Sequence, residues 1–141
     1  MLKQVIVMRT DLGMRKGKMI AQGAHAAMLF LLNSLSGPDY RGSNYLTDDE
    51  IRWAFGVSTS ETALMEAGWE YGLMAKIVVG IDSEAALLWI YQKALEAGLT
   101  AHLVTDAGKT EFGGIPTKTC CAIGPGQADD IDKVTGHLKL L

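Results

Sequence analysis

The sequence has few cysteines, no excess of positive charge and no apolar run long enough to cross a membrane. Its two cysteines, Cys120 and Cys121, are adjacent, so in a strand they would point to opposite faces, and no zinc-like spacing links them to the three histidines. We therefore expect buried thiols in a reducing cytoplasm, and neither a disulfide nor a metal site. Even the apolar stretch 26–32 is far shorter than the roughly 20 residues of a membrane span. The N-terminus leads directly into a strand pattern, so neither an anchor nor a leader is expected.

The net charge of −3 argues against a protein that coats nucleic acid without regard to sequence, but the charges are unevenly distributed. Residues 1–38 carry five basic groups against one acid, whereas residues 39–70 carry seven acids against two arginines. The N-terminal third could therefore offer a local positive field to a phosphate. Ordinary solvated surface charge explains the same composition equally well.

Short β-branched runs alternate with segments of helical periodicity, which is typical of an α/β domain with a parallel sheet. At 141 residues and 48% hydrophobic, the chain suffices for one domain, residues 1–141, with a core of its own. The predicted strands cover residues 3–8, 76–80, 101–105 and 119–123, and the predicted helices cover residues 18–33, 83–97 and 127–135. Residues 34–72 are predicted to be an elaborated helical connection, because two capping-box spacings follow a loop rich in glycine and serine. The Gly-Pro-Gly sequence at 124–126 predicts a break before the last helix.

The segment from residue 16 to residue 26 opens the first predicted helix and carries a polar stripe. Lys18, Gln22 and His25 are spaced at i, i+4 and i+7, and so share one helix face. Such a stripe on an otherwise apolar helix commonly lines a site, although His25 alone is more often a structural residue. Residues 13–19 and 108–110 each approach a phosphate-binding loop but lack a required residue, so nucleotide hydrolysis is not predicted.

Polar residues also follow the third predicted strand, where Asp106-Ala-Gly-Lys-Thr110 begins a loop. If the first and third strands are parallel, their carboxyl ends lie on one rim of the sheet, where ligands of open α/β sheets bind. Lys18 and Asp106 should then converge. Taken singly, Asp106 more often caps a turn, and Thr110, Thr117 and Thr119 are more often ordinary strand residues. Taken together, an acid, a lysine and several hydroxyls on two converging loops could hold a water, polarise a carbonyl and receive a phosphate.

Five sequence blocks follow one another along the chain: Lys16-Gly-Lys18-x-x-Ala21-Gln22-x-x-His25-Ala26, Trp69-Glu-Tyr, Asp106-Ala-Gly-Lys-Thr110, Ala122-Ile-Gly-Pro125 and Ile131-Asp-Lys-Val-Thr-Gly-His-Leu-Lys-Leu-Leu141. In this order they resemble the type II peptidyl-tRNA hydrolases. The third and fifth blocks together are highly specific, whereas the Ala-Gln-x-x-His element alone would be weak. The resemblance covers the chain except for about residues 34–68.

The resemblance implies an enzyme that hydrolyses the ester between a peptidyl or N-blocked aminoacyl group and the 3′ ribose of tRNA. It implies a three-layer α/β/α fold with a mixed, mostly parallel four-stranded sheet, often a homodimer, with no cofactor and no metal. The catalytic residues would be Lys18, Asp106, Thr110 and Thr119. The residues that bind the tRNA substrate would be Arg9, Arg15, Lys16, Gln22, His25, Lys109, Thr117 and Lys118.

Three features depart from the family pattern. Leu73-Met74 replaces a Gly-Gln pair, the loop from Glu111 to Thr119 is one residue longer than usual, and the acidic connection after the first helix is also longer. Two other functions therefore stay open. One is a non-catalytic module of the same fold that binds tRNA or a protein, and the other is a hydrolase of a different small acyl ester or amide.

Overall fold

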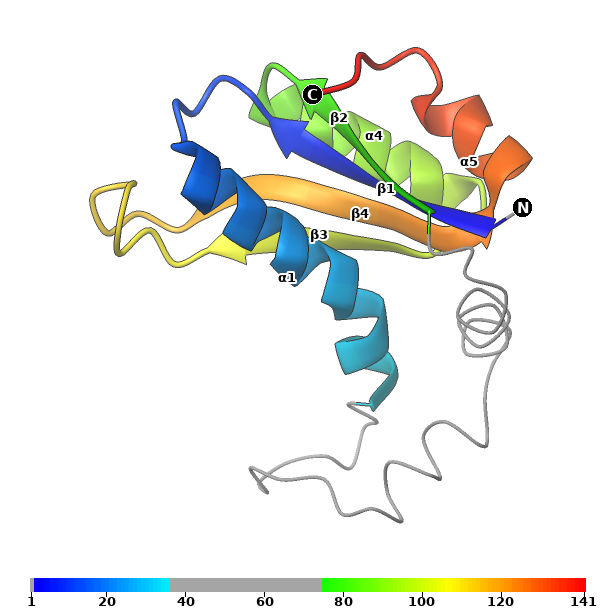
Figure 1. Cartoon of the computed structure of the whole chain (residues 1–141), viewed down its shortest axis with the longest axis horizontal. Coiled ribbons are helices and arrows are strands. Elements are labelled where there is room, and N and C mark those ends of the chain that lie inside the picture. Colours follow the sequence, from blue (N-terminus) through cyan, green and yellow to red (C-terminus); the bar gives the residue numbers. More distant parts are fainter. Residues whose placement is uncertain (1, 36–74) are drawn as a thin grey trace.

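The computed structural model describes residues 2–35 and 75–141, which form a sheet with helices on both sides (Figure 1). In chain order the elements are β1 (Leu2–Arg9), α1 (Lys16–Leu35), β2 (Ala75–Ile81), α4 (Glu84–Glu96), β3 (Ala101–Asp106), β4 (Thr117–Gln127) and α5 (Ala128–Thr135). The predicted order of strands and helices is confirmed for these residues. The helices predicted within the 34–72 connection, and the Leu73-Met74 pair, lie outside the described residues. Among the residues that are described, no helix combines the length and apolarity that a membrane span needs.

The sheet has the strand order β2-β1-β4-β3 and is mixed. β1 and β2 pair in parallel, from Lys3 opposite Ala75 to Arg9 opposite Ile81. β4 lies between β1 and β3 and runs antiparallel to both. The α/β class with a mixed four-stranded sheet is confirmed, but only one of its three pairs of neighbouring strands is parallel. The expectation of a mostly parallel sheet is therefore wrong, because β4 lies between β1 and β3 and opposes both. Because β1 and β3 both oppose β4, they run in the same direction, so their carboxyl ends lie on one rim as predicted.

Different helices cover the two faces of the sheet. Successive residues of β1 and β4 alternate between two apolar clusters, as the two-residue period of a strand requires. One cluster joins Ile6, Met8 and Cys120 to Ala26 of α1. The other joins the alternate residues of both strands to α4 and α5. The result is a layered α/β/α arrangement, with α1 in front of the sheet and α4 behind it in Figure 1.

The two cysteines point to opposite faces of β4, as predicted for neighbouring strand residues. Cys120 packs in the cluster under α1 and Cys121 in the cluster under α4 and α5, and both are buried. Burial raises the pKa of the Cys120 thiol to about 11 and that of Cys121 to about 12. Both thiols therefore stay protonated at neutral pH, and neither serves as a thiolate nucleophile.

Most element boundaries differ from the predicted ones by one or two residues, and the largest difference is at the end of β4. α1 begins at Lys16, slightly before the predicted start, and β4 continues through Gly124-Pro125-Gly126 to Gln127. The predicted break at the Gly-Pro-Gly sequence is therefore wrong. A register shift between Lys3 and Val5 of β1 absorbs the irregular step. Proline fits at such a bulge because no regular ladder hydrogen bond is required of it there.

The C-terminal residues lie along the outer edge of β2. The Gly80 amide donates to the Lys139 carbonyl at 2.9 Å, and the Leu141 amide donates to the Val78 carbonyl at 3.1 Å. The tail thus pairs with part of a strand whose outer backbone groups would otherwise face solvent. Such cover blunts the tendency of an edge strand to pair with another chain.

Candidate active site

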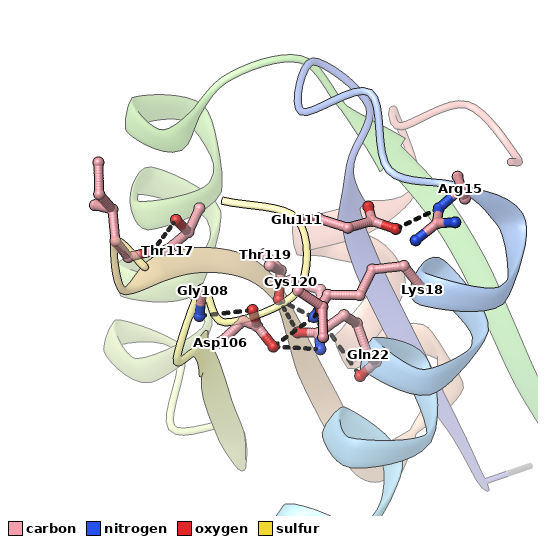
Figure 2. Close-up of polar contacts among 11 residues, drawn as sticks. Arg15, Lys18, Gln22, Asp106, Gly108, Glu111, Thr117, Thr119 and Cys120 are labelled. Atoms are coloured by element: carbon pink, nitrogen blue, oxygen red, sulfur yellow. Dashed lines mark hydrogen bonds and ion pairs between the residues drawn. The ribbon is translucent and has the colours of Figure 1, made fainter. Parts of the chain in front are cut away.

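Lys18 and Asp106 meet at the carboxyl rim of the sheet. Lys18 lies in the first turn of α1, and Asp106 is the last residue of β3. The Lys18 Nζ atom lies 2.7 Å from Asp106 Oδ1 although the two residues are 88 positions apart (Figure 2). Their side chains are 13% and 14% exposed, so the pair is largely shielded from water. The predicted convergence of these two residues is confirmed.

The Asp106 carboxylate accepts hydrogen bonds from three fixed donors. Oδ1 accepts from Lys18 and, at 3.1 Å, from Gln22 Nε2, while Oδ2 accepts from the Gly108 amide at 2.9 Å. The hydrogen bond from Lys18 is the main cause that lowers the pKa of Asp106 below its ordinary value of 3.8, and partial burial opposes the shift. Asp106 is therefore ionised at neutral pH and is a weak base. Its geometry suits it to fix the position of other groups.

The Lys18 ammonium contacts three different groups. Besides its bond to Asp106, it donates to Thr110 Oγ1 at 3.1 Å, and it lies 5.5 Å from the centre of the Phe112 ring. A carboxylate, a hydroxyl and an aromatic face together hold the ammonium in one place. A positive charge with a fixed position can stabilise negative charge that develops on a reacting oxygen.

The loop after β3 takes its shape because residue 108 is glycine. Gly108 has a φ of +77°, and a Cβ atom there would lie 2.1 Å from the Ile115 carbonyl oxygen. The Gly114 amide donates to the Gly108 carbonyl at 2.8 Å, which closes the loop on itself. The same glycine therefore permits the close turn and supplies the amide that binds Asp106.

Gln22 and Thr119 lie beneath Asp106 and not at the surface. Their exposed fractions are 1% and 0%. The Thr119 hydroxyl donates to Gln22 Oε1, and the Gln22 amide in turn donates to Asp106 (Figure 2). Both side chains are buried and linked to the carboxylate, so their geometry suits them to position Asp106. The catalytic role of Thr119 and the substrate contact of Gln22 stay predictions.

The variant Thr119→Val should lower kcat about tenfold with little change in KM. It removes the hydroxyl that donates to the buried side-chain carbonyl of Gln22, and such a loss costs about 1–3 kcal/mol. Gln22 then holds Asp106 less firmly. Steady-state kinetics and thermal unfolding measure both effects. Thr135→Val is a matched control, since the buried Thr135 hydroxyl donates to the Ile131 carbonyl within α5. It should reduce stability while kcat stays near wild type. Equal kcat values for the two variants, or failure of Thr119→Ser to restore turnover, would contradict the positioning role.

Two residues predicted to bind substrate do not join this cluster. His25 is exposed on α1 and lies about 10 Å further along the helix axis than Lys18. The Thr117 hydroxyl donates to the Ile115 carbonyl at 2.8 Å, and in Figure 2 its side chain lies apart from Lys18. The substrate contacts of both residues stay predictions.

Arg9, for which a phosphate contact is predicted, is held by groups of the protein itself. Its side chain is 9% exposed and binds both carboxylate oxygens of Asp11, at 3.0 and 2.7 Å. It also donates to the Lys118 carbonyl at 3.0 Å. The hydrogen bond with Asp11 is the main cause that raises the pKa of Arg9 above its ordinary value. The guanidinium is thus occupied inside the protein, where it ties the turn after β1 to β4.

The other predicted phosphate-binding residues are exposed or partly exposed. Arg15, Lys16 and Lys109 are exposed, and they neighbour Lys18 and Asp106 in sequence. Lys118 is partly exposed, with Nζ 3.9 Å from a carboxylate oxygen of Glu84. Their contact with phosphate stays a prediction.

Sequence reasoning missed Glu111 and Phe112, which lie against the cluster from the loop after β3. Glu111 Oε1 accepts from Arg15 Nε at 2.8 Å. No spacing rule marks either residue, because a loop of this length carries no periodicity that would relate its side chains to α1. Within residues 2–35 and 75–141, no group of three or more His, Cys, Asp or Glu side chains is arranged to hold a metal.

Together the fold and the site define a small α/β enzyme with a shielded lysine–carboxylate pair at the carboxyl rim of its sheet. The family model described as "Peptidyl-tRNA hydrolase PTH2" matches residues 2–141. The chain belongs to this family.

Individual relatives extend over nearly the whole chain. The chain is 39% identical to a peptidyl-tRNA hydrolase of Methanocaldococcus jannaschii, over 99% of this chain and 100% of that protein. It is also 39% identical to a peptidyl-tRNA hydrolase of Methanothermobacter thermautotrophicus, again over 99% and 100%. A human protein named "Peptidyl-tRNA hydrolase 2, mitochondrial" is 36% identical, over 98% of this chain and 63% of its own length.

Proposed function

We propose that this protein hydrolyses the ester bond between a peptidyl or N-blocked aminoacyl group and the 3′ ribose of tRNA, which returns the tRNA to use. The observation that carries the proposal is the Lys18 ammonium, held 2.7 Å from Asp106 and 3.1 Å from Thr110 at the carboxyl rim. The relatives described above are named peptidyl-tRNA hydrolases. We expect no cofactor, because a positioned water and a charge stabiliser suffice for ester hydrolysis.

In the proposed reaction, a water attacks the acyl carbonyl carbon and the carbonyl oxygen becomes an oxyanion. The Lys18 ammonium stabilises this negative charge, with help from the positive end of α1, since Lys18 lies in its first turn. The intermediate then expels the ribose 3′ oxygen, which takes one proton that came from the water, while the other passes to solvent. The products are a carboxylate on the peptide and a free 3′-hydroxyl on the tRNA.

Asp106 contributes to this reaction mainly by orientation. Its lowered pKa makes it a weak acceptor of the water proton, but its two oxygens fix Lys18 and the loop that carries Thr110. Thr110 is exposed at the rim, so its hydroxyl can bind the attacking water while it accepts from Lys18. Asp106, Lys18 and Thr110 thus hold the water and the oxyanion relative to each other.

Binding of tRNA should weaken steeply with salt, because phosphate contacts release counterions. If Arg15, Lys16, Lys109 and Lys118 meet phosphates, affinity should fall about 10- to 100-fold between 50 and 200 mM salt. The measurement is a binding titration with uncharged tRNA at several salt concentrations. Lys16→Ala should reduce the slope, whereas Lys93→Ala, which removes a cation from α4 behind the sheet, should leave it unchanged. A flat salt dependence would contradict this phosphate contact surface.

The decisive assay incubates purified protein with N-acetyl-aminoacyl-tRNA, with uncharged tRNA and with a simple acyl ester. Release of the N-acetyl amino acid from tRNA, with little cleavage of the simple ester, supports the proposed function. Binding of tRNA without release would favour the non-catalytic module, and cleavage of the simple ester alone would favour a different acyl hydrolase. A cytoplasmic location and a homodimer stay predictions, which cell fractionation and analytical ultracentrifugation can test.

A further inference from the structure

The segment Glu111-Phe112 forms a cover over the Lys18 ammonium and is tied to Arg15. Figure 2 shows the contact between Glu111 and Arg15. Arg15, which directly precedes α1, donates from Nε to Glu111 Oε1 at 2.8 Å, and the Phe112 ring centre lies 5.5 Å from the Lys18 ammonium. With these contacts in place the Lys18 and Asp106 side chains are 13% and 14% exposed. An ester carbonyl must displace part of this cover to reach the ammonium.

The two partners of the Arg15–Glu111 ion pair differ in their access to solvent. The Arg15 side chain is 82% exposed, whereas that of Glu111 is 13% exposed. A guanidinium binds phosphate well, because its planar fork can donate two parallel hydrogen bonds to one phosphate group. An RNA phosphate can therefore reach Arg15 from solvent and compete with Glu111. An ester that carries no phosphate cannot compete in this way.

We propose that Arg15 and Glu111 make access to the Lys18–Asp106 pair depend on RNA. A phosphate of the bound RNA takes the Arg15 guanidinium from Glu111, and the segment Glu111-Phe112 then moves away from Lys18. Esters attached to RNA are thereby preferred over esters of the same acyl group without a phosphate. The inference rests on the proposed function, and it identifies two residues that set substrate specificity without taking part in bond cleavage.

Two backbone hydrogen bonds lie within the loop and do not involve Arg15. The Gly114 amide donates to the Gly108 carbonyl at 2.8 Å, and the Ile115 amide donates to the Phe112 carbonyl at 3.0 Å, so these bonds keep the loop's shape whether or not Arg15 is engaged. The covered and uncovered arrangements then differ in which anion Arg15 holds and in whether the Phe112 ring stays near Lys18. A ligand shifts such an equilibrium only through its different affinity for the two arrangements, and a phosphate provides that difference at Arg15.

The test compares the wild type with Glu111→Gln, which weakens the bond to Arg15 without changing the size of the side chain. The substrates are N-acetyl-aminoacyl-tRNA and the same N-acetyl-aminoacyl ester on adenosine, which has no phosphate. Glu111→Gln should raise kcat/KM for the adenosine ester about three- to tenfold, as expected from the loss of one charge-assisted hydrogen bond, and should change kcat/KM for the tRNA ester less. Glu96→Gln is the matched control, since it weakens a surface ion pair on α4 and should leave both values unchanged.

Hydrogen exchange provides a second readout that needs no turnover. The amides of residues 111–113 should exchange faster in Glu111→Gln than in the wild type or in Glu96→Gln, whereas the Gly114 and Ile115 amides, which are bonded within the loop, should not. A short RNA oligonucleotide should accelerate exchange at residues 111–113 in the wild type, and adenosine should not. An unchanged preference between the two esters, with unchanged exchange, would overturn the inference while hydrolysis of the tRNA ester still supports the proposed function. If the wild type cleaves neither ester, the proposed function fails, and the exchange measurement alone decides whether RNA controls the cover.

Discussion

Asp106→Asn should lower kcat for peptidyl-tRNA hydrolysis by about 10²- to 10³-fold, the usual cost of losing one preorganised electrostatic group in an active site. The substitution keeps the size of the side chain but removes the negative charge that holds Lys18 at 2.7 Å. The ammonium is then free to leave the position in which it would face the oxyanion. Single-turnover kinetics with N-acetyl-aminoacyl-tRNA measure the loss directly.

Asp130→Asn is the control for this prediction, because Asp130 is an exposed acid on α5 that pairs with Lys133 far along the chain from the site. It should retain wild-type turnover.

The pH dependence adds a second check. Since the folded pKa of Asp106 lies below its ordinary value of 3.8, the ion pair stabilises the fold above that value, and this stabilisation is lost as pH falls through the folded pKa. The assignment of Asp106 as ionised at neutral pH would be contradicted by one result. Turnover of the wild type would fall below about pH 6 as the pH is lowered, and turnover of Asp106→Asn would not.

The position of the Lys18–Asp106 pair could be predicted from sequence because it depends on few facts. It requires only that β1 and β3 run in the same direction and that Lys18 and Asp106 follow them at the carboxyl ends. The sequence pattern did not reveal that β4 lies between these strands and opposes both. With β4 between them, the carboxyl ends of β1 and β3 still lie on one rim. The predicted convergence therefore holds, although the sheet is not the parallel one that the sequence pattern indicated.

The depth of the side chains could not be predicted in the same way. A helical or strand period gives the face on which a residue lies, but the burial of that face depends on what packs against it. Gln22 and Thr119 lie on faces that meet each other, so they form a buried support for Asp106. Arg9 is the last residue of the core strand β1, and its guanidinium binds the carboxylate of Asp11, two residues further along the chain.

The loop after β3 was the least predictable part of the site. Its shape depends on Gly108, whose missing Cβ lets the Ile115 carbonyl approach, and on hydrogen bonds within the loop. These determine that Phe112 lies over Lys18 and that Glu111 reaches Arg15. A single sequence contains no periodic signal for such contacts. They nevertheless determine which groups surround the Lys18 ammonium.

Lys18→Ala should lower kcat about 10²- to 10³-fold, because it removes the charge assigned to the oxyanion. Lys133→Ala is the control, since it removes a lysine and its ion pair with Asp130 at the surface of α5. It should leave kcat unchanged. Lys18→Arg separates charge from geometry. The arginine keeps the positive charge, so the variant should keep its affinity for tRNA. The guanidinium is larger and planar, and it does not fit the place of the ammonium between Asp106, Thr110 and Phe112. Little turnover should therefore return. Near-wild-type turnover of Lys18→Ala would mean that another donor stabilises the oxyanion, whereas full recovery in Lys18→Arg would mean that charge alone matters at this position.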